Sequence, residues 1–459
     1  MPRAPSSSAL SAADALRSIL EERQIRDVKI GIYDIDGVMA GKYMSTAKFL
    51  SALKGGFGFC DVLFGWDVAN KLYDNTRLTG WQRGYADAEV RLLPESWREL
   101  PFEANTLLVQ GEIVGRLEGL CPRGVLRRVL DRAADMGFSA FAGFEYEFLV
   151  LEDSIQMLQE KGFRHMRPMG TGGFGYSVLR NSVNTEFYEG LMALCHTMDM
   201  PVEGLHEETG PGALEAALHV NPALKASDDA ALFKTFVKVL AQRQKRTACF
   251  MAKWDESQSG QGGHIHVSLQ DKAGRNVFHD AAQPQGISAL QRHFVAGLLH
   301  HMPAITALAA PTINSYRRLV PGYWAPTTAL WGVDNRTVSV RAIPGSSTSQ
   351  RVEYRLPGAD CNPYLALASC LAAGLDGIAQ RMTPPEPVTT NGYLLDVPPE
   401  QHLPRTLWDA AQALKASPAM ADWLGADFVE HFALTREWEA RQFQASVTDW
   451  ELNRYFEII

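Results

Sequence analysis

The chain has 459 residues, of which 46% are hydrophobic and 21% charged, and a formal net charge of −8 at pH 7. These proportions are typical of a globular protein with two or three domains. The negative charge argues against general nucleic-acid binding, because the basic residues of 243–246 and elsewhere are scattered and form no long tract.

The cysteines and the hydrophobic pattern indicate a cytoplasmic protein. Six cysteines are spread along the chain without a CxxC pair, which favours neither a zinc site nor a disulfide framework. The first residues lack the apolar centre of a signal peptide, and no run of about 18 apolar residues occurs. We therefore expect neither export nor a membrane span.

The N-terminal quarter predicts a small domain that contains a hairpin. Its pattern indicates a helix over 11–24, two strands joined by an Asp-Gly turn over 28–45, and a strand over 106–114. We place a domain boundary near residue 118, with domains 1–118 and 119–459.

The second domain alternates strands with long helices. Helical spacing over 123–137 is followed by strand patterns over 139–150 and 262–271. Two further helical patterns cover 227–247 and 285–309. This mixed order predicts an α+β fold.

A pair of acids in "GFEYEFLV" is the first candidate for chemistry. Glu145 and Glu147 are two apart in a strand, so their carboxylates share one face, roughly 6 to 7 Å apart. Carboxylates this close repel each other unless a cation lies between them. The alternating Phe144, Tyr146 and Phe148 predict that the other face is core. The alternative is a solvated strand face.

Two further patterns repeat this logic. Glu207 and Glu215 stand either side of the Gly-Pro-Gly turn 210–212, which could fold both acids toward one point. His264 and His266 share a strand face directly after two glycines that permit close backbone approach. A structural role for these histidines is the alternative.

The segment "RVEYR" alternates charges along one strand face. Arg351, Glu353 and Arg355 would form either a surface ladder or part of an anion site. Further arginines flank the preceding turns and strands: Arg317, Arg318, Arg336 and Arg341. Acids, histidine and arginines together describe a site where divalent ions hold a polyphosphate during phosphoryl transfer. No Walker loop and no GxGxxG motif directly after a strand competes with this interpretation.

These patterns, in this order, resemble the glutamine synthetase superfamily from about residue 28 to the C-terminus. The matching motifs are "GFEYEFLV", "HEETGPGALE", "GGHIHVSL", "NSYRRLVPGYWAP", "DNRTVSVR" and "RVEYRLPGADCNPYLALA". The resemblance implies an N-terminal β-grasp domain and a large catalytic domain with a curved antiparallel sheet flanked by helices. It also implies a homo-oligomer of two stacked rings with active sites between subunits.

The resemblance assigns metal ligands position by position. Two to three Mg or Mn ions are expected per site. The first ion would be held by Glu147, Glu207 and Glu215. The second would be held by Glu145, His264 and Glu353.

The resemblance also assigns substrate contacts. The residues expected to bind the nucleotide are His266, Arg336, Arg341 and Arg351. Those expected at glutamate and the nucleophile are Gly260, His264, Arg318, Trp324 and Arg355. The four with a catalytic role would be Arg318, Arg336, Arg341 and Arg355.

The implied reaction has two steps. The γ-carboxylate of glutamate attacks the γ-phosphate of ATP, and an amine nitrogen then displaces phosphate from γ-glutamyl phosphate to form an amide. Metals and arginines would supply the electrostatics of the first step.

One departure concerns the nucleophile. Ammonia-using members read Gly-Tyr-Glu-Ala-Pro where this chain has Trp324, and their Asp-Gly-Ser-Ser motif is missing, with Asp61 or Asp67 as possible substitutes. Tryptophan accepts no proton but offers an apolar π surface. We therefore expect an organic amine as the substrate, most simply a monoamine with an apolar tail.

Four alternatives stay open. They are a γ-glutamylpolyamine synthetase, a glutamine synthetase that uses ammonia, a non-catalytic family member and, against the complete ligand set, a guanidino kinase. Tyr393 is only an offset candidate for the adenylylation tyrosine of bacterial members, so we expect no regulation of that kind.

Overall fold

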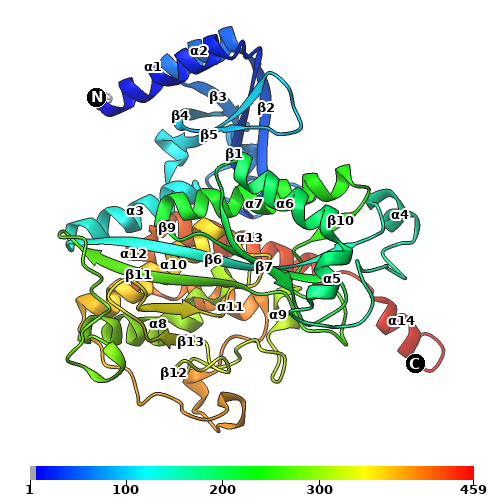
Figure 1. Ribbon diagram of the computed structural model, residues 1–459. Helices are drawn as coiled ribbons and strands as arrows, with labels where there is room; N and C mark the ends of the chain where they lie inside the picture. Colours follow the sequence, from blue (N-terminus) through cyan, green and yellow to red (C-terminus); the bar gives the residue numbers. More distant parts are fainter. Residues whose placement is uncertain (1–6) are drawn as a thin grey trace.

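The computed structural model describes residues 7–459, which form two sheets with their own cores (Figure 1). The smaller sheet has the order β2-β1-β5-β4-β3. Its strands are β1 (Asp27–Tyr33), β2 (Met39–Ser45), β3 (Phe57–Cys60), β4 (Asp87–Glu99) and β5 (Thr106–Val114). The predicted hairpin is confirmed, because β1 pairs antiparallel with β2, and β1 also pairs parallel with β5.

Two helices cover this sheet. Leu16 and Leu20 of α1 (Ser7–Glu22) share a buried cluster with Phe49 and Ala52 of α2 (Thr46–Gly55) and with the sheet residue Val90. Sheet and helices thus bury each other's apolar faces. After β5 the chain continues through a 3-10 helix, Gly115–Leu120, and the domain boundary near residue 118 stays a prediction.

The larger sheet has the order β12-β13-β14-β11-β6-β8-β7, and β9 and β10 also pair with β6. Its strands are β6 (Phe138–Leu151), β7 (Val202–Glu207), β8 (Ala213–Leu218), β9 (Asn221–Pro222), β10 (Thr247–Cys249), β11 (Gly263–Asp271), β12 (Trp331–Val333), β13 (Val340–Ile343) and β14 (Arg351–Tyr354). Only β12 and β13 run parallel among these pairs, so the predicted antiparallel α+β architecture is confirmed.

Helices bury one face of this sheet. Among them, α3 (Pro122–Asp135), α7 (Ala223–Arg243) and α8 (Ala289–Ala309) contact its strands, and α10 (Pro363–Ala379) packs against these three helices. The others are α4 (Ile155–Glu160), α5 (Val178–Val183), α6 (Thr185–Thr197), α9 (Ser315–Arg318), α11 (Leu407–Lys415), α12 (Pro418–Leu424), α13 (Ala426–Gln444) and α14 (Asp449–Tyr455). Phe144, Tyr146 and Phe148 of β6 face this core and are at most 1% exposed. Polar residues are left for the opposite face.

The two parts of the chain meet through buried polar contacts. Arg436 of α13 lies 2.8 Å from Asp36 in the β1–β2 turn, and His431 lies 3.0 Å from the carbonyl of Phe64. None of the helices within residues 7–459 combines the length and apolar character needed to cross a bilayer.

Candidate active site

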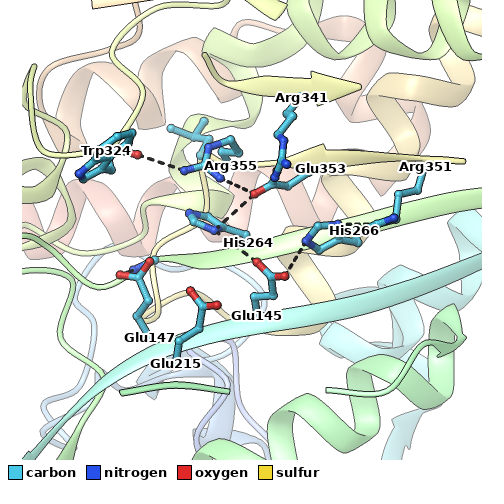
Figure 2. Close-up of polar contacts among 12 residues, drawn as sticks. Glu145, Glu147, Glu215, His264, His266, Trp324, Arg341, Arg351, Glu353 and Arg355 are labelled. Atoms are coloured by element: carbon cyan, nitrogen blue, oxygen red, sulfur yellow. Dashed lines mark hydrogen bonds and ion pairs between the residues drawn. The ribbon is translucent and has the colours of Figure 1, made fainter. Parts of the chain in front are cut away.

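Strand pairing gathers both predicted histidines and all of the predicted acids except Glu207 on one face of the large sheet (Figure 2). His264 of β11 is paired with Glu145 of β6, and Glu147 with Glu215 of β8. Glu353 of β14 lies opposite His266 on one side and Arg341 on the other. Directly paired residues point to the same face, so register alone brings these side chains together.

The first group of ligand atoms surrounds Glu145. His264 Nδ1 lies 3.8 Å from a Glu145 oxygen and 3.6 Å from a Glu353 oxygen. His266 Nε2 lies 3.1 Å from the other Glu145 oxygen. Ligand atoms of Glu145, His266 and Glu353 fall within 4.8 Å of one another. Both histidines therefore reach this group, and carboxylate and imidazole donors suit Mg or Mn.

The pKa values of these acids are shifted in opposite directions. Burial alone would raise the pKa of Glu145, but contacts with His264 and His266 outweigh it and lower this pKa. Arg355 and His264 likewise overcome burial at Glu353 and lower its pKa to about 2. Burial and the neighbouring carboxylates, Glu145 first, raise the pKa of Glu215 to about 9. A bound cation would relieve this crowding of negative charge.

The structure does not bring Glu207 into this group, and that prediction is wrong in its register. Glu207 is paired with Leu214, so it points to the other face from Glu215, is 5% exposed and accepts a hydrogen bond of 3.2 Å from Tyr188. The physical reason is the period of two along a strand. Its neighbour Glu208 lines the site instead.

Glu208 forms a second group that sequence reasoning missed. Ligand atoms of His206, Glu208 and Glu215 lie within 4.8 Å of one another. The buried Nε2 of His206 has no hydrogen-bond partner in the described part of the chain, which also fits a cation. This register depends on how β7 and β8 pair across the turn at 210–212. The sequence pattern does not show that pairing.

Arginines line the opposite side of the site. Arg341 donates to Glu353 across 2.9 Å and to Asp334 across 3.0 Å, and Arg355 pairs with the other Glu353 oxygen. Arg351 donates from Nε to His266 Nδ1 across 3.0 Å. The alternating faces of "RVEYR" are thus confirmed, and the segment is no surface ladder.

Arg318 and Gly260 form the wall beside this group. Arg318 is 3% exposed and donates to the carbonyls of Leu356 and Arg355 across 2.8 and 3.2 Å. A Cβ atom at Gly260 would lie 2.5 Å from Cγ of Arg318 and 2.6 Å from the carbonyl oxygen of Ala252. Only glycine allows this close approach.

A central cavity of about 360 Å³ collects these side chains. The predicted site residues that line it are Glu145, Glu147, Glu215, Gly260, His264, His266, Arg318, Trp324, Arg336, Arg341, Arg351, Glu353 and Arg355. Glu207 is the one predicted residue that it lacks. Tyr176, which sequence reasoning also missed, lines the cavity and stacks on His206 with ring centroids 4.5 Å apart.

Two further cavities adjoin the central one. The first, of about 320 Å³, shares Glu145, His266 and Arg351 with it and extends past Phe141 and Val220. The second, of about 700 Å³, is polar and is reached past Arg336 and Arg341; its other wall is the segment 388–391. Trp324 borders both this cavity and the central one.

Trp324 lies at the end of the site away from the acids (Figure 2). Its side chain is 58% exposed, whereas the next residue, Ala325, is 1% exposed. Its backbone has φ +59°, the left-handed region that tryptophan rarely adopts. The two candidate acids of the small sheet do not line the cavity of this chain: Asp61 is buried against Arg116 at 2.7 Å, and Asp67 accepts backbone hydrogen bonds in its own turn.

Known proteins share this architecture. Residues 119–455 match the family "Glutamine synthetase, catalytic domain". Type-1 glutamine synthetase 2 of Dictyostelium discoideum is 40% identical over 98% of this chain and 87% of its own length. Glutamate–isopropylamine ligase of Pseudomonas sp is 36% identical over 97% of this chain and 98% of its own length.

Two more likenesses point the same way. Gamma-glutamylethanolamide synthetase GlnA4 of Streptomyces coelicolor is 36% identical over 97% of this chain and 95% of its own length. A solved GmaS/ADP complex superimposes with a TM-score of 0.84 at 28% identity, covering 96% of this chain and 99% of that one. With these matches across the sheet, the site and nearly the whole length, the chain belongs to the glutamine synthetase family.

Proposed function

We propose that the protein is an ATP-dependent ligase that joins the γ-carboxylate of glutamate to an organic amine, a monoamine with an apolar tail. The observation that carries this proposal is Trp324 at the wall of the central cavity, beside Arg355 and away from Glu145, Glu147 and Glu215. Relatives named for isopropylamine and for ethanolamide support an organic amine as the nucleophile.

The acidic end contains two groups of side chains, each suited to a divalent ion, Mg or Mn. One ion would be held by Glu145, His264 and Glu353, and the other by Glu147, Glu208 and Glu215. Such ions, when bound, neutralise phosphate oxygens. Glu353 is itself held between Arg341 and Arg355, so its carboxylate is oriented before any ligand enters.

The chain's own residues would divide the remaining work. The cavity beside His266 and Arg351 is suited to the nucleotide, because Phe141 and Val220 offer an apolar wall for a base. Arg336 and Arg341 would stabilise the negative charge of the transferring phosphoryl group. Buried Arg318 and its neighbour Arg355 would bind the carboxylates of glutamate.

The amine end selects by surface and not by charge. Trp324 offers an indole face that packs against methylene or methyl groups, and it cannot pair with ammonium as a carboxylate does. A polyamine would place a second ammonium near this face, where it would lack a counter-ion. A monoamine leaves no such charge unpaired.

A glutamine synthetase that uses ammonia is the second candidate. The relative in Dictyostelium discoideum, named as a glutamine synthetase and 40% identical, favours it. Trp324 argues against it, because ammonia has no apolar part for the indole to contact. The complete cavity lining also argues against a non-catalytic family member.

Assembly and location extend the proposal. By family resemblance, we propose a homo-oligomer of stacked rings in the cytoplasm, with each site completed by a neighbouring copy. The helix α14, which projects from the body in Figure 1, carries the exposed side chains Trp450 and Leu452 and is followed by exposed Phe456, as expected of a contact between copies.

The test is phosphate release from ATP with glutamate, Mg and a panel of ammonia, ethanolamine, alkyl and aryl monoamines, and polyamines, with product masses confirmed. We expect turnover with monoamines and little with ammonia. Trp324→Glu should lose activity with bulky amines and gain some with ammonia, whereas Trp324→Phe, the matched control, should keep the monoamine preference. Turnover by the wild type with ammonia alone would overturn the proposal.

A further inference from the structure

The Trp324 loop, residues 320–326, holds its tryptophan in an unfavourable backbone conformation. A tryptophan at φ +59° costs free energy because its Cβ approaches the backbone. Such a residue keeps its conformation only when its surroundings hold it there. Since Trp324 borders the central cavity, the contacts that hold this loop also decide where the indole lies.

Two side chains hold the loop. Arg355 reaches the Trp324 carbonyl at 3.5 Å, a long contact from a guanidinium that is already paired with Glu353. The hydroxyl of Tyr393 donates to the Ala325 carbonyl at 3.2 Å. The tyrosine contact is therefore the shorter of the two, and it comes from a distant part of the chain.

Tyr393 is itself firmly placed. It lies in the segment 388–395, where Asn335 donates to the carbonyls of Val388 and Thr390 across 3.0 and 2.9 Å. The Gly392 amide donates to the Thr337 hydroxyl across 2.8 Å. Asn335 and Thr337 flank Arg336, so the segment is tied to the stretch of chain that carries a cavity arginine.

The second cavity, of about 700 Å³, gives the loop somewhere to move. It is lined by Trp324 and by the residues 388–391. A loop released from Tyr393 could shift its indole toward this space and so enlarge the central cavity. The hydroxyl of Tyr393 therefore limits the size of the amine that fits the central cavity.

We propose that Tyr393 is a positioning residue for amine selection: its hydroxyl fixes the Trp324 loop and so sets the tail that the indole accepts. This inference rests on the proposed function and deepens it. Tyr393 does not line the central cavity, so it acts through Trp324 and not by touching glutamate or ATP.

The test compares Michaelis constants in Tyr393→Phe, which keeps the ring and removes only the hydroxyl. Loss of one hydrogen bond should raise KM for the best monoamine about 3- to 10-fold. KM for glutamate and for ATP should stay within about two-fold, since the variant leaves their contacts intact. Leu394→Ala, in the same turn but 81% exposed, is the matched control and should change none of these constants.

A double-mutant cycle separates positioning from general damage. In a Trp324→Ala background the Tyr393→Phe effect on KM for the amine should disappear, because the side chain through which it acts is gone. Thr337→Val, which removes the acceptor of the Gly392 amide, should change amine KM in the same direction as Tyr393→Phe.

Equal increases in all three KM values, or a Tyr393→Phe effect that persists in Trp324→Ala, would overturn the proposal. A wild type that uses only ammonia would instead overturn the proposed function. In that case KM for ammonia in the same variants tests the positioning role of Tyr393 separately. An unchanged KM for ammonia would overturn that role too.

Discussion

Four strands supply the charged end of the central cavity, whereas one loop supplies its aromatic end. Glu147, Glu215, His264 and Glu353 come from β6, β8, β11 and β14, and their alignment follows from sheet register. Trp324 stands on irregular backbone held by a few hydrogen bonds. Phosphoryl chemistry thus rests on the rigid element, and the choice of amine on a segment whose side chain can change without disturbing the sheet.

The largest expected effect tests the strand register at the charged end, that is, whether Glu208 or Glu207 enters the cavity. Glu208→Gln should reduce turnover about 100- to 1,000-fold and raise the Mg requirement, because it removes a charged ligand in the cavity. Glu207→Gln is the matched control and should cost less than about three-fold in turnover, because its side chain contacts Tyr188 outside the cavity. Phosphate release at varied Mg measures both, and the reverse ranking would show that the hairpin register is wrong.

His431, a buried histidine outside the central cavity, reports on the stability of the whole fold and not on the site. Burial lowers the pKa of His431 to about 4, against a partial opposing effect of its hydrogen bond to Phe64. Above pH 6.5 the histidine is neutral in both states. Between about pH 6.5 and 4 the unfolded histidine takes up a proton that the folded one does not, so the contribution of His431 to stability falls as pH drops, by roughly 3 kcal/mol over this window.

Urea unfolding from pH 7 to 4 measures this loss. His431→Gln, whose amide can still donate to the Phe64 carbonyl, should show a shallower decline over the same window. The slope of Trp324→Phe should match the wild type, because this variant changes no titratable group and leaves His431 intact. An unchanged slope in His431→Gln would contradict the assignment.

Crowding beside the charged end gives a smaller expected effect. Gly260→Ala would push a Cβ against Arg318 and the Ala252 carbonyl, so we expect KM for glutamate to rise about 10-fold. Gly119→Ala is the control, since its Cβ meets nothing within 4 Å. Kinetics with varied glutamate at saturating ATP would detect the difference, and an unchanged KM in both would place glutamate elsewhere.

The aromatic end should contribute least to stability. Trp324→Gly removes an exposed side chain and relieves the left-handed strain, while glycine adds flexibility to the unfolded chain. These terms oppose each other, so the free energy of unfolding should change by less than about 1 kcal/mol in urea titrations. A loss above about 2 kcal/mol would show that the indole packs like a core residue, which would weaken the contrast between the two ends.

Much of the site followed from alternation along strands. The aromatic residues between Glu145 and Glu147 correctly placed the core behind them, and "RVEYR" correctly placed its charges on one face. The error at Glu207 arose across a turn, where a shift of one residue exchanges the two faces of a strand. Tyr176 has no local signal, because only folding stacks it on His206.

Local patterns in the sequence were enough to predict several of the elements and the kinds of chemistry, because the two-residue period of a strand and the charge of a side chain are local properties. Tertiary structure decided which carboxylate of the pair Glu207 and Glu208 enters the cavity, how arginines hold Glu353 and which distant tyrosine holds the Trp324 loop. These depend on register and on contacts between segments far apart in the chain, and such contacts have no local pattern to reveal them.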